Sequence, residues 1–129
     1  MYGSTGAPQL DSRLLGSKLG ADFNITTDQA ISISGTTKYV VRKIIVTNAS
    51  ISLTLAAGGF YATAAKVNAL VAAAQVYSAL TTTSKYLDCT LTALALSDVR
   101  TEATLFLSLT TGQGAAATAD IYIYGDVLV

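Results

Sequence analysis

Side chains able to perform acid–base or nucleophilic chemistry are scarce in this chain of 129 residues. Histidine is absent, and there is one cysteine, Cys89, and one glutamate, Glu102. Without histidine, Ser-His-Asp and Cys-His triads and imidazole metal sites are impossible. A lone cysteine excludes a disulfide or a cysteine-based zinc cluster within the chain. We therefore expect no catalytic residues, no cofactor and no enzymatic activity.

The acidic side chains do not form a metal-binding pattern. A calcium loop needs carboxylates at its first, third and fifth positions. The acids in the second half of the chain are spread too widely for this: Asp88, Asp98, Glu102, Asp120 and Asp126. We expect no metal site.

The basic side chains form one local group, Lys38, Arg42 and Lys43. On a regular strand Lys38 and Arg42 share a face while Lys43 points to the other, because successive side chains alternate. This spacing predicts solvated or ion-paired side chains rather than a continuous patch for a phosphate or an acidic partner.

Two further features have structural interpretations. Cys89 falls on the apolar side of an alternating segment, so it is expected to pack as a small hydrophobic residue. Gly112-Gln113-Gly114 lacks the Lys-Ser/Thr that follows in a phosphate-binding loop, so it is expected to be a turn.

Tyr122 and Tyr124 share the strand face opposite Ile121 and Ile123. Tyrosine is enriched at protein interfaces. The pair either caps a half-buried face or lines an interface, and it supplies the candidate interface residues.

Composition restricts the class of partner. Lys plus Arg is 8 and Asp plus Glu is 8, so the formal net charge is zero. Charged residues are 12% of the chain, about half the roughly 25% of an average globular protein. A nucleic-acid binder needs a basic excess, and a disordered chain needs more charge and less hydrophobicity. A surface with so few charges is typical of a protein that covers part of its area with other chains, so we expect a homo-oligomer and no nucleic-acid partner.

No targeting or membrane segment is visible. The N-terminal residues lack the apolar core of a signal peptide. The longest apolar stretches, such as 69–74, are far shorter than the roughly 20 residues that span a bilayer. We expect a protein made in a cytoplasm, with no membrane partner.

From Gln29 onward the dominant hydrophobic period is two, which predicts strands. The expected strand segments are 31–33, 39–47, 51–55, 87–93, 105–109 and 121–124. A Gly-containing connection predicts an antiparallel hairpin between 104–111 and 118–125. Residues 66–80 fit either a helix or two short strands or a strand and loop, of which the β alternatives are favoured. We predict an all-β antiparallel sandwich, jelly-roll-like, over residues 28–129.

Residues 1–27 contain several glycines and no β-branched run, which predicts an extended N-terminal arm outside the sandwich. Leucines within it could share part of one helical stripe. They are candidate docking residues, on a segment that is either a poorly ordered terminus or one that orders on a partner surface: Leu10, Leu14, Leu15 and Leu19.

Parts of the sequence resemble small structural proteins of tailed phages. The resemblance is carried by residues 41–50 (VRKIIVTNAS), 57–61 (AGGFY), 72–80 (AAAQVYSAL) and 107–125 (LSLTTGQGAAATADIYIYG). It extends over roughly residues 39–125, so the arm is not part of it.

The resemblance implies a capsid cement or decoration protein of jelly-roll type that binds and stabilises the shell. Its implied partners are the major capsid protein and other copies of itself, and its implied location is the capsid exterior of a virion. Such proteins act through surfaces, so no functional residue is carried over. The alternatives are a phage tail, fibre or spike module and a carbohydrate-binding β-sandwich. Dimer and trimer both remain open.

Overall fold

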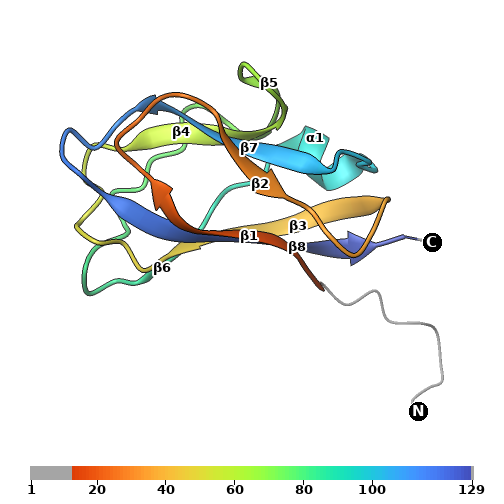
Figure 1. Cartoon of the computed structure of the whole chain (residues 1–129), viewed down its shortest axis with the longest axis horizontal. Coiled ribbons are helices and arrows are strands. Elements are labelled where there is room, and N and C mark those ends of the chain that lie inside the picture. The colour runs from red at the N-terminus through yellow and green to blue at the C-terminus, as the bar shows by residue number, and fades with distance from the viewer. Residues whose placement is uncertain (1–12, 129) are drawn as a thin grey trace, which may run out of the picture.

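A computed structural model describes residues 13–128 as two four-stranded antiparallel sheets packed face to face (Figure 1). The first sheet has the order β1-β8-β3-β6, with bounds Arg13–Asp22, Thr118–Val127, Tyr39–Thr47 and Tyr86–Asp88. The second has the order β2-β7-β4-β5, with bounds Gln29–Ser32, Thr104–Thr111, Ala57–Thr63 and Val67–Val71. One short helix, α1 (Ala93–Ser97), lies between β6 and β7 in the chain. The expected all-β sandwich is confirmed.

The strand pairs are nested along the chain. β1 pairs with β8, β2 with β7, β3 with β6 and β4 with β5, all antiparallel. Two more pairs, β3 with β8 and β4 with β7, complete the sheets. Every connection except β4–β5 therefore passes from one sheet to the other.

The core lies between the sheets and comes from the alternating residues of each strand. In β8, Ile121 and Ile123 are fully buried, and in β7 the same is true of Leu105, Leu107 and Leu109. This alternation confirms the strand segments expected over 31–33, 39–47, 105–109 and 121–124. β4 is buried on both faces over residues 58–62. Burial of the apolar side chains between the sheets supplies the main driving force for folding.

The hairpin expected between 104–111 and 118–125 is wrong. Both segments are strands, but β7 belongs to the second sheet and β8 to the first. The connection crosses the end of the sandwich, where Gln113 N–H donates to Phe23 O and Phe23 N–H donates to Ala117 O, both at 2.9 Å. Alternation reports that each segment has a buried face, but it does not identify the pairing partner.

The expected arm is also wrong in part. Arg13–Asp22 is β1, paired with β8 along its length, so the β structure begins well before residue 28. Its glycines are not linker residues. A Cβ on Gly16 would collide with the carbonyl oxygen of Ser32, where β1 passes close to β2, and Gly20 has a positive φ of 67° within a bulge.

Two other segments differ from expectation, and one agrees. Residues 51–55 are not a strand, although Leu53 is buried. The strand expected over 87–93 ends at Asp88, and α1 follows, its N-terminus capped by the Thr92 hydroxyl, which accepts from Ala95 N–H at 3.1 Å. Residues 66–80 form β5 and a loop, as favoured.

A buried glutamine holds two loops together at one end of the sandwich. Gln113 Oε1 accepts from the backbone N–H groups of Leu55 and Ala56 at 2.9 and 3.1 Å, and its Nε2 donates to Thr54 Oγ1 at 3.0 Å. Gln113 is thus the partner of backbone donors in a segment that has no strand partner. Buried backbone groups of this kind must be satisfied, because an unpaired one costs about as much as a lost hydrogen bond.

We predict that Gln113→Leu lowers the free energy of unfolding by about 2 to 4 kcal/mol, because two backbone donors lose their acceptor. Urea denaturation measures this loss of stability, which appears as a lower midpoint with an unchanged m-value. Gln75→Ala is the matched control: Gln75 also accepts from a backbone N–H, that of Thr90 at 3.0 Å, but near solvent, where water replaces the bond. Equal effects of the two substitutions would contradict the role of Gln113.

Candidate functional site

The one thiol of the chain lies in the core. Cys89 is 4% exposed. Burial, helped by the charge of Asp88, raises the pKa of its thiol from its ordinary value of 9.0 to about 12. Thiol chemistry needs the thiolate form, so Cys89 is a packing residue, as expected from its position in the alternation.

Arg100 is a second buried polar group, and its contacts are structural. Its Nη2 lies 3.0 Å from Asp98 Oδ2, and its Nε lies 3.4 Å from Glu102 Oε1. Its backbone pairs with Tyr39 in both directions, and the Tyr39 hydroxyl donates to Glu102 O at 2.6 Å. Burial, then the charge of Glu102, raises the pKa of Tyr39. Together these contacts hold the segment after α1 against the start of β3.

Asp28 stabilises the strained β4–β5 turn. Ala65 and Lys66 have positive φ values of 65° and 61°, which residues other than glycine rarely adopt. Asp28 Oδ2 accepts from Ala65 N–H at 2.8 Å, and Oδ1 accepts from Ser108 Oγ at 2.7 Å. These two bonds, the backbone one first, lower the pKa of Asp28. Both carboxylate oxygens of Asp28 are therefore engaged in hydrogen bonds that stabilise the fold.

Within residues 13–128 no three His, Cys, Asp or Glu side chains gather where they could hold a metal ion. The same residues contain no helix that is long and apolar enough to cross a membrane.

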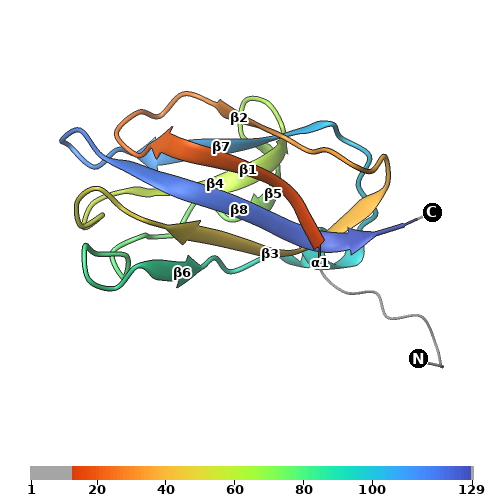
Figure 2. The same ribbon diagram turned by 60° about the horizontal axis from the view of Figure 1, so that its bottom comes forward.

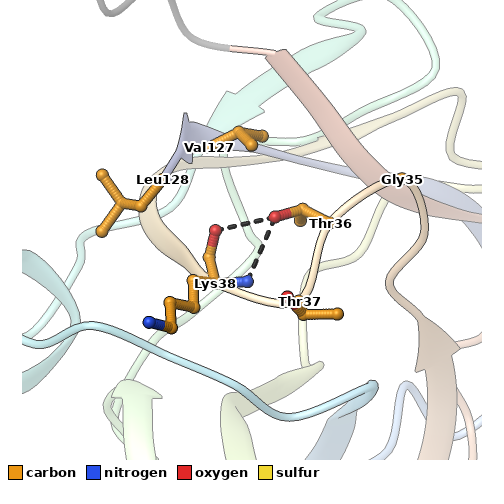
Figure 3. A pocket seen from close by; sticks show the side chains of 6 residues that line it. All are labelled: Gly35, Thr36, Thr37, Lys38, Val127 and Leu128. Carbon is orange, nitrogen blue, oxygen red and sulfur yellow. Dashed lines mark hydrogen bonds between the residues drawn. The ribbon is translucent and has the colours of Figure 1, made fainter.

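One hollow lies at the end of the sandwich near the last residues of β8 (Figure 3). Its volume is about 740 Å³, and it is lined by Gly35, Thr36, Thr37, Lys38, Val127 and Leu128. The Thr36 hydroxyl is bonded to both backbone groups of Lys38. One ammonium and short side chains offer no set of groups that could orient a reacting molecule.

The outer surface of the first sheet is different, because apolar and aromatic side chains meet there. Tyr122 and Tyr124 point away from the core, because they alternate along β8 with the buried Ile121 and Ile123. We call this surface the tyrosine face. Its members are Leu14, Ser17, Lys43, Ile45, Asp88, Tyr122 and Tyr124.

Strand register orders the tyrosine face in two rows. Tyr124 lies opposite Leu14 of β1 on one side and Lys43 of β3 on the other. The next row carries Ser17, Tyr122, Ile45 and Asp88, one from each strand of the sheet. Directly opposed residues share a face. Figure 2 shows the four strands side by side, with no other described segment lying over them.

A β-bulge places two consecutive cations at the edge of the tyrosine face. The β3–β8 register shifts between Val41 and Lys43, so Arg42 and Lys43 are both exposed. Arg42 Nε lies 2.8 Å from Asp126 Oδ2, and Lys43 Nζ lies 3.8 Å from Asp88 Oδ2. Together with Ile45 and Tyr124 the two cations line a hollow of about 310 Å³.

The predicted site residues are only partly brought together. Leu10 lies outside the described residues. Leu14 and Leu19 are exposed, at 52% and 67%, whereas Leu15 is buried in the core, so the leucines form no single stripe. Tyr122 and Tyr124 face outward as predicted, and Leu14 joins Tyr124 on the tyrosine face.

Sequence reasoning missed Ile45 and the outward side chain of Lys43. It placed Lys43 on the face opposite Arg42, and the bulge overturns this. A signal was present: Arg42 and Lys43 are consecutive charges in an apolar strand, and regular alternation would bury one of them without compensation.

Comparison of the chain with protein-family models, curated proteins and solved structures finds no match.

We predict that the Cys89 thiol of the native protein does not react with maleimide at pH 8, because it is buried and its pKa is raised to about 12. The same protein unfolded in urea reacts at the rate of a free thiol. Mass spectrometry against time measures both. Labelling of the native protein at the unfolded rate would contradict the placement of Cys89 in the core.

We predict that Asp28→Asn destabilises the protein at pH 7 but not in acid. The native pKa of Asp28 is lowered, so its stabilising contribution is present above its ordinary value of 3.8 and is lost as the pH falls through the native value. Urea unfolding of the wild-type protein and the variant from pH 7 down to about pH 2 measures the difference between their free energies of unfolding. A difference that does not become smaller in acid would contradict the role of the Asp28 carboxylate.

Proposed function

We propose that this protein is a non-enzymatic structural protein of a phage virion, which binds the exterior of the capsid shell and stabilises it. The resemblance of residues 39–125 to small tailed-phage structural proteins supports this at the level of sequence. Three of the described polar groups agree with it, because Cys89 packs in the core and Arg100 and Asp28 bond within the fold. A protein of this kind acts through its surfaces.

We also propose that the sandwich is of the jelly-roll type. A jelly roll has eight strands in two sheets and is common among viral capsid proteins. The nested pairs β1–β8, β2–β7, β3–β6 and β4–β5 support this, because a long antiparallel double strand gives them when it is wound around the core. The sheet orders β1-β8-β3-β6 and β2-β7-β4-β5 follow from the same winding.

The observation that carries the functional proposal is the tyrosine face. It sets Leu14, Ile45, Tyr122 and Tyr124 on the outer surface of a sheet, next to the paired charges of Lys43 and Asp88. Aromatic and aliphatic residues surrounded by polar ones are typical of protein interfaces. A modest contact per copy is enough on a shell, because repetition across many copies multiplies its effect.

The test is addition of the purified protein to capsids that lack it, followed by cryo-electron microscopy. We expect regular density on the capsid exterior and greater resistance of the shell to heat. Tyr122→Ser with Tyr124→Ser should weaken binding by about thirtyfold or more, since truncation of an interface aromatic that is a hot spot costs about 2 kcal/mol. Val67→Ser, an exposed apolar residue on β5 of the other sheet, is the matched control.

Two outcomes would contradict the proposal. Density on the tail instead of the shell would make the protein a tail, fibre or spike module. Absence of binding to any part of the virion would remove the structural role altogether.

A further inference from the structure

We propose that the tyrosine face is covered by a second copy of this chain, related by a twofold axis that lies in the plane of the face. The axis runs across the strands and passes β8 between Tyr122 and Tyr124. This inference rests on the proposed function and deepens it: the tyrosine face joins two copies, and the pair binds the shell through its other surfaces, so that loss of the face weakens capsid binding by separating the pair. Its test uses the protein alone in solution, so it does not depend on capsid binding.

The centre of the face fits such an arrangement. Tyr122 and Tyr124 are two residues apart on one side of β8, which is a separation of roughly 7 Å along the strand. A twofold axis between them sets Tyr122 of one copy against Tyr124 of the other, and the reverse contact follows by symmetry. Leu14 and Ile45 extend the apolar area on either side of β8.

The charges on the face are complementary to those of a second copy. Lys43 lies in the row of Tyr124, and Asp88 lies in the row of Tyr122. An axis that exchanges the two rows brings Lys43 of each copy towards Asp88 of the other. Within one chain this pair is loose, with Nζ and Oδ2 3.8 Å apart and side chains 46% and 47% exposed, so both groups are able to take a second partner.

The bulge in β3 is what makes the lysine available. Without the register shift between Val41 and Lys43, Arg42 and Lys43 would point to opposite sides of the sheet. Arg42 stays with Asp126 at 2.8 Å, so Lys43 is the cation free to reach outward. Bulges commonly re-aim a side chain at a functional surface.

The balance of charge favours a second copy over a nucleic acid. Arg42 and Lys43 are matched by Asp126 and Asp88 at the same place, so the surface has no cationic excess to attract phosphates. The second sheet needs no such partner. Its outward Tyr61 is 3% exposed, and Asp28 bonds to the outward Ser108, so the chain's own loop covers that side.

The experiment is sedimentation equilibrium of the full chain at concentrations up to about 200 μM, well above the dissociation constant of a specific dimer. We expect a dimer. Lys43→Asp and Asp88→Lys should each raise the dissociation constant by about tenfold or more, because each sets like charges against one another. The double variant should restore wild-type affinity to within about threefold, since it reverses every pair. Lys38→Asp, an exposed lysine away from the face, is the control.

Four results would overturn the inference. They are a wild-type protein that stays monomeric, a trimer, a dimer that the single charge reversals do not weaken, and a double variant that does not recover. If deletion of residues 1–12 abolishes the dimer while Lys43→Asp leaves it intact, the N-terminal residues form the contact instead. A dimer that does not bind capsids would keep this inference and reject the proposed function, and capsid binding by a monomer would do the opposite.

Discussion

The pairing of β8 on both of its edges is the interaction on which the rest of this structure depends. β1 occupies one edge and β3 the other, so one strand from the end of the chain joins two from its first half. This pairing fixes which side chains of β8 enter the core and which reach the surface. Ile121 and Ile123 are buried because the opposite register would expose them, and Tyr122 and Tyr124 are therefore directed outward.

Much of the fold follows from the sequence, because strand formation is a local property and its alternation is strong. The segments 39–47 and 104–111 match the observed strands because apolar residues recur at every second position within them. Pairing is not local. The Gly112–Gln113–Gly114 turn is compatible with a hairpin, and the contacts that hold it across the end of the sandwich come from distant parts of the chain. Gln113 bonds to Phe23 through its backbone and to Leu55 and Ala56, 58 and 57 residues away, through its side chain.

Part of the tyrosine face was also predictable from the sequence, because alternation along a single strand is a local property. Tyr122 and Tyr124 could be assigned to one outward face from the two-residue period alone. Leu15 could not be assigned to the core, because β1 contains Gly16 and Gly20, and glycines in a terminal segment indicate a linker as readily as a strand. Here they serve close packing against Ser32 and a bulge, which are tertiary constraints.

The two sheets differ in what covers the aromatic side chains on their outer faces. Each has aromatic residues on its outer side, because β structure favours tyrosine and phenylalanine even where a strand faces solvent. On the second sheet the loop before β2 lies over that side, and Asp28 ties it to Ser108 and to the β4–β5 turn. Over the first sheet no described segment of the chain takes that place. Its aromatic side chains therefore remain available to a partner, and because the neighbouring Lys43 and Asp88 are opposite in sign, the face has no charge excess that would attract a partner from long range.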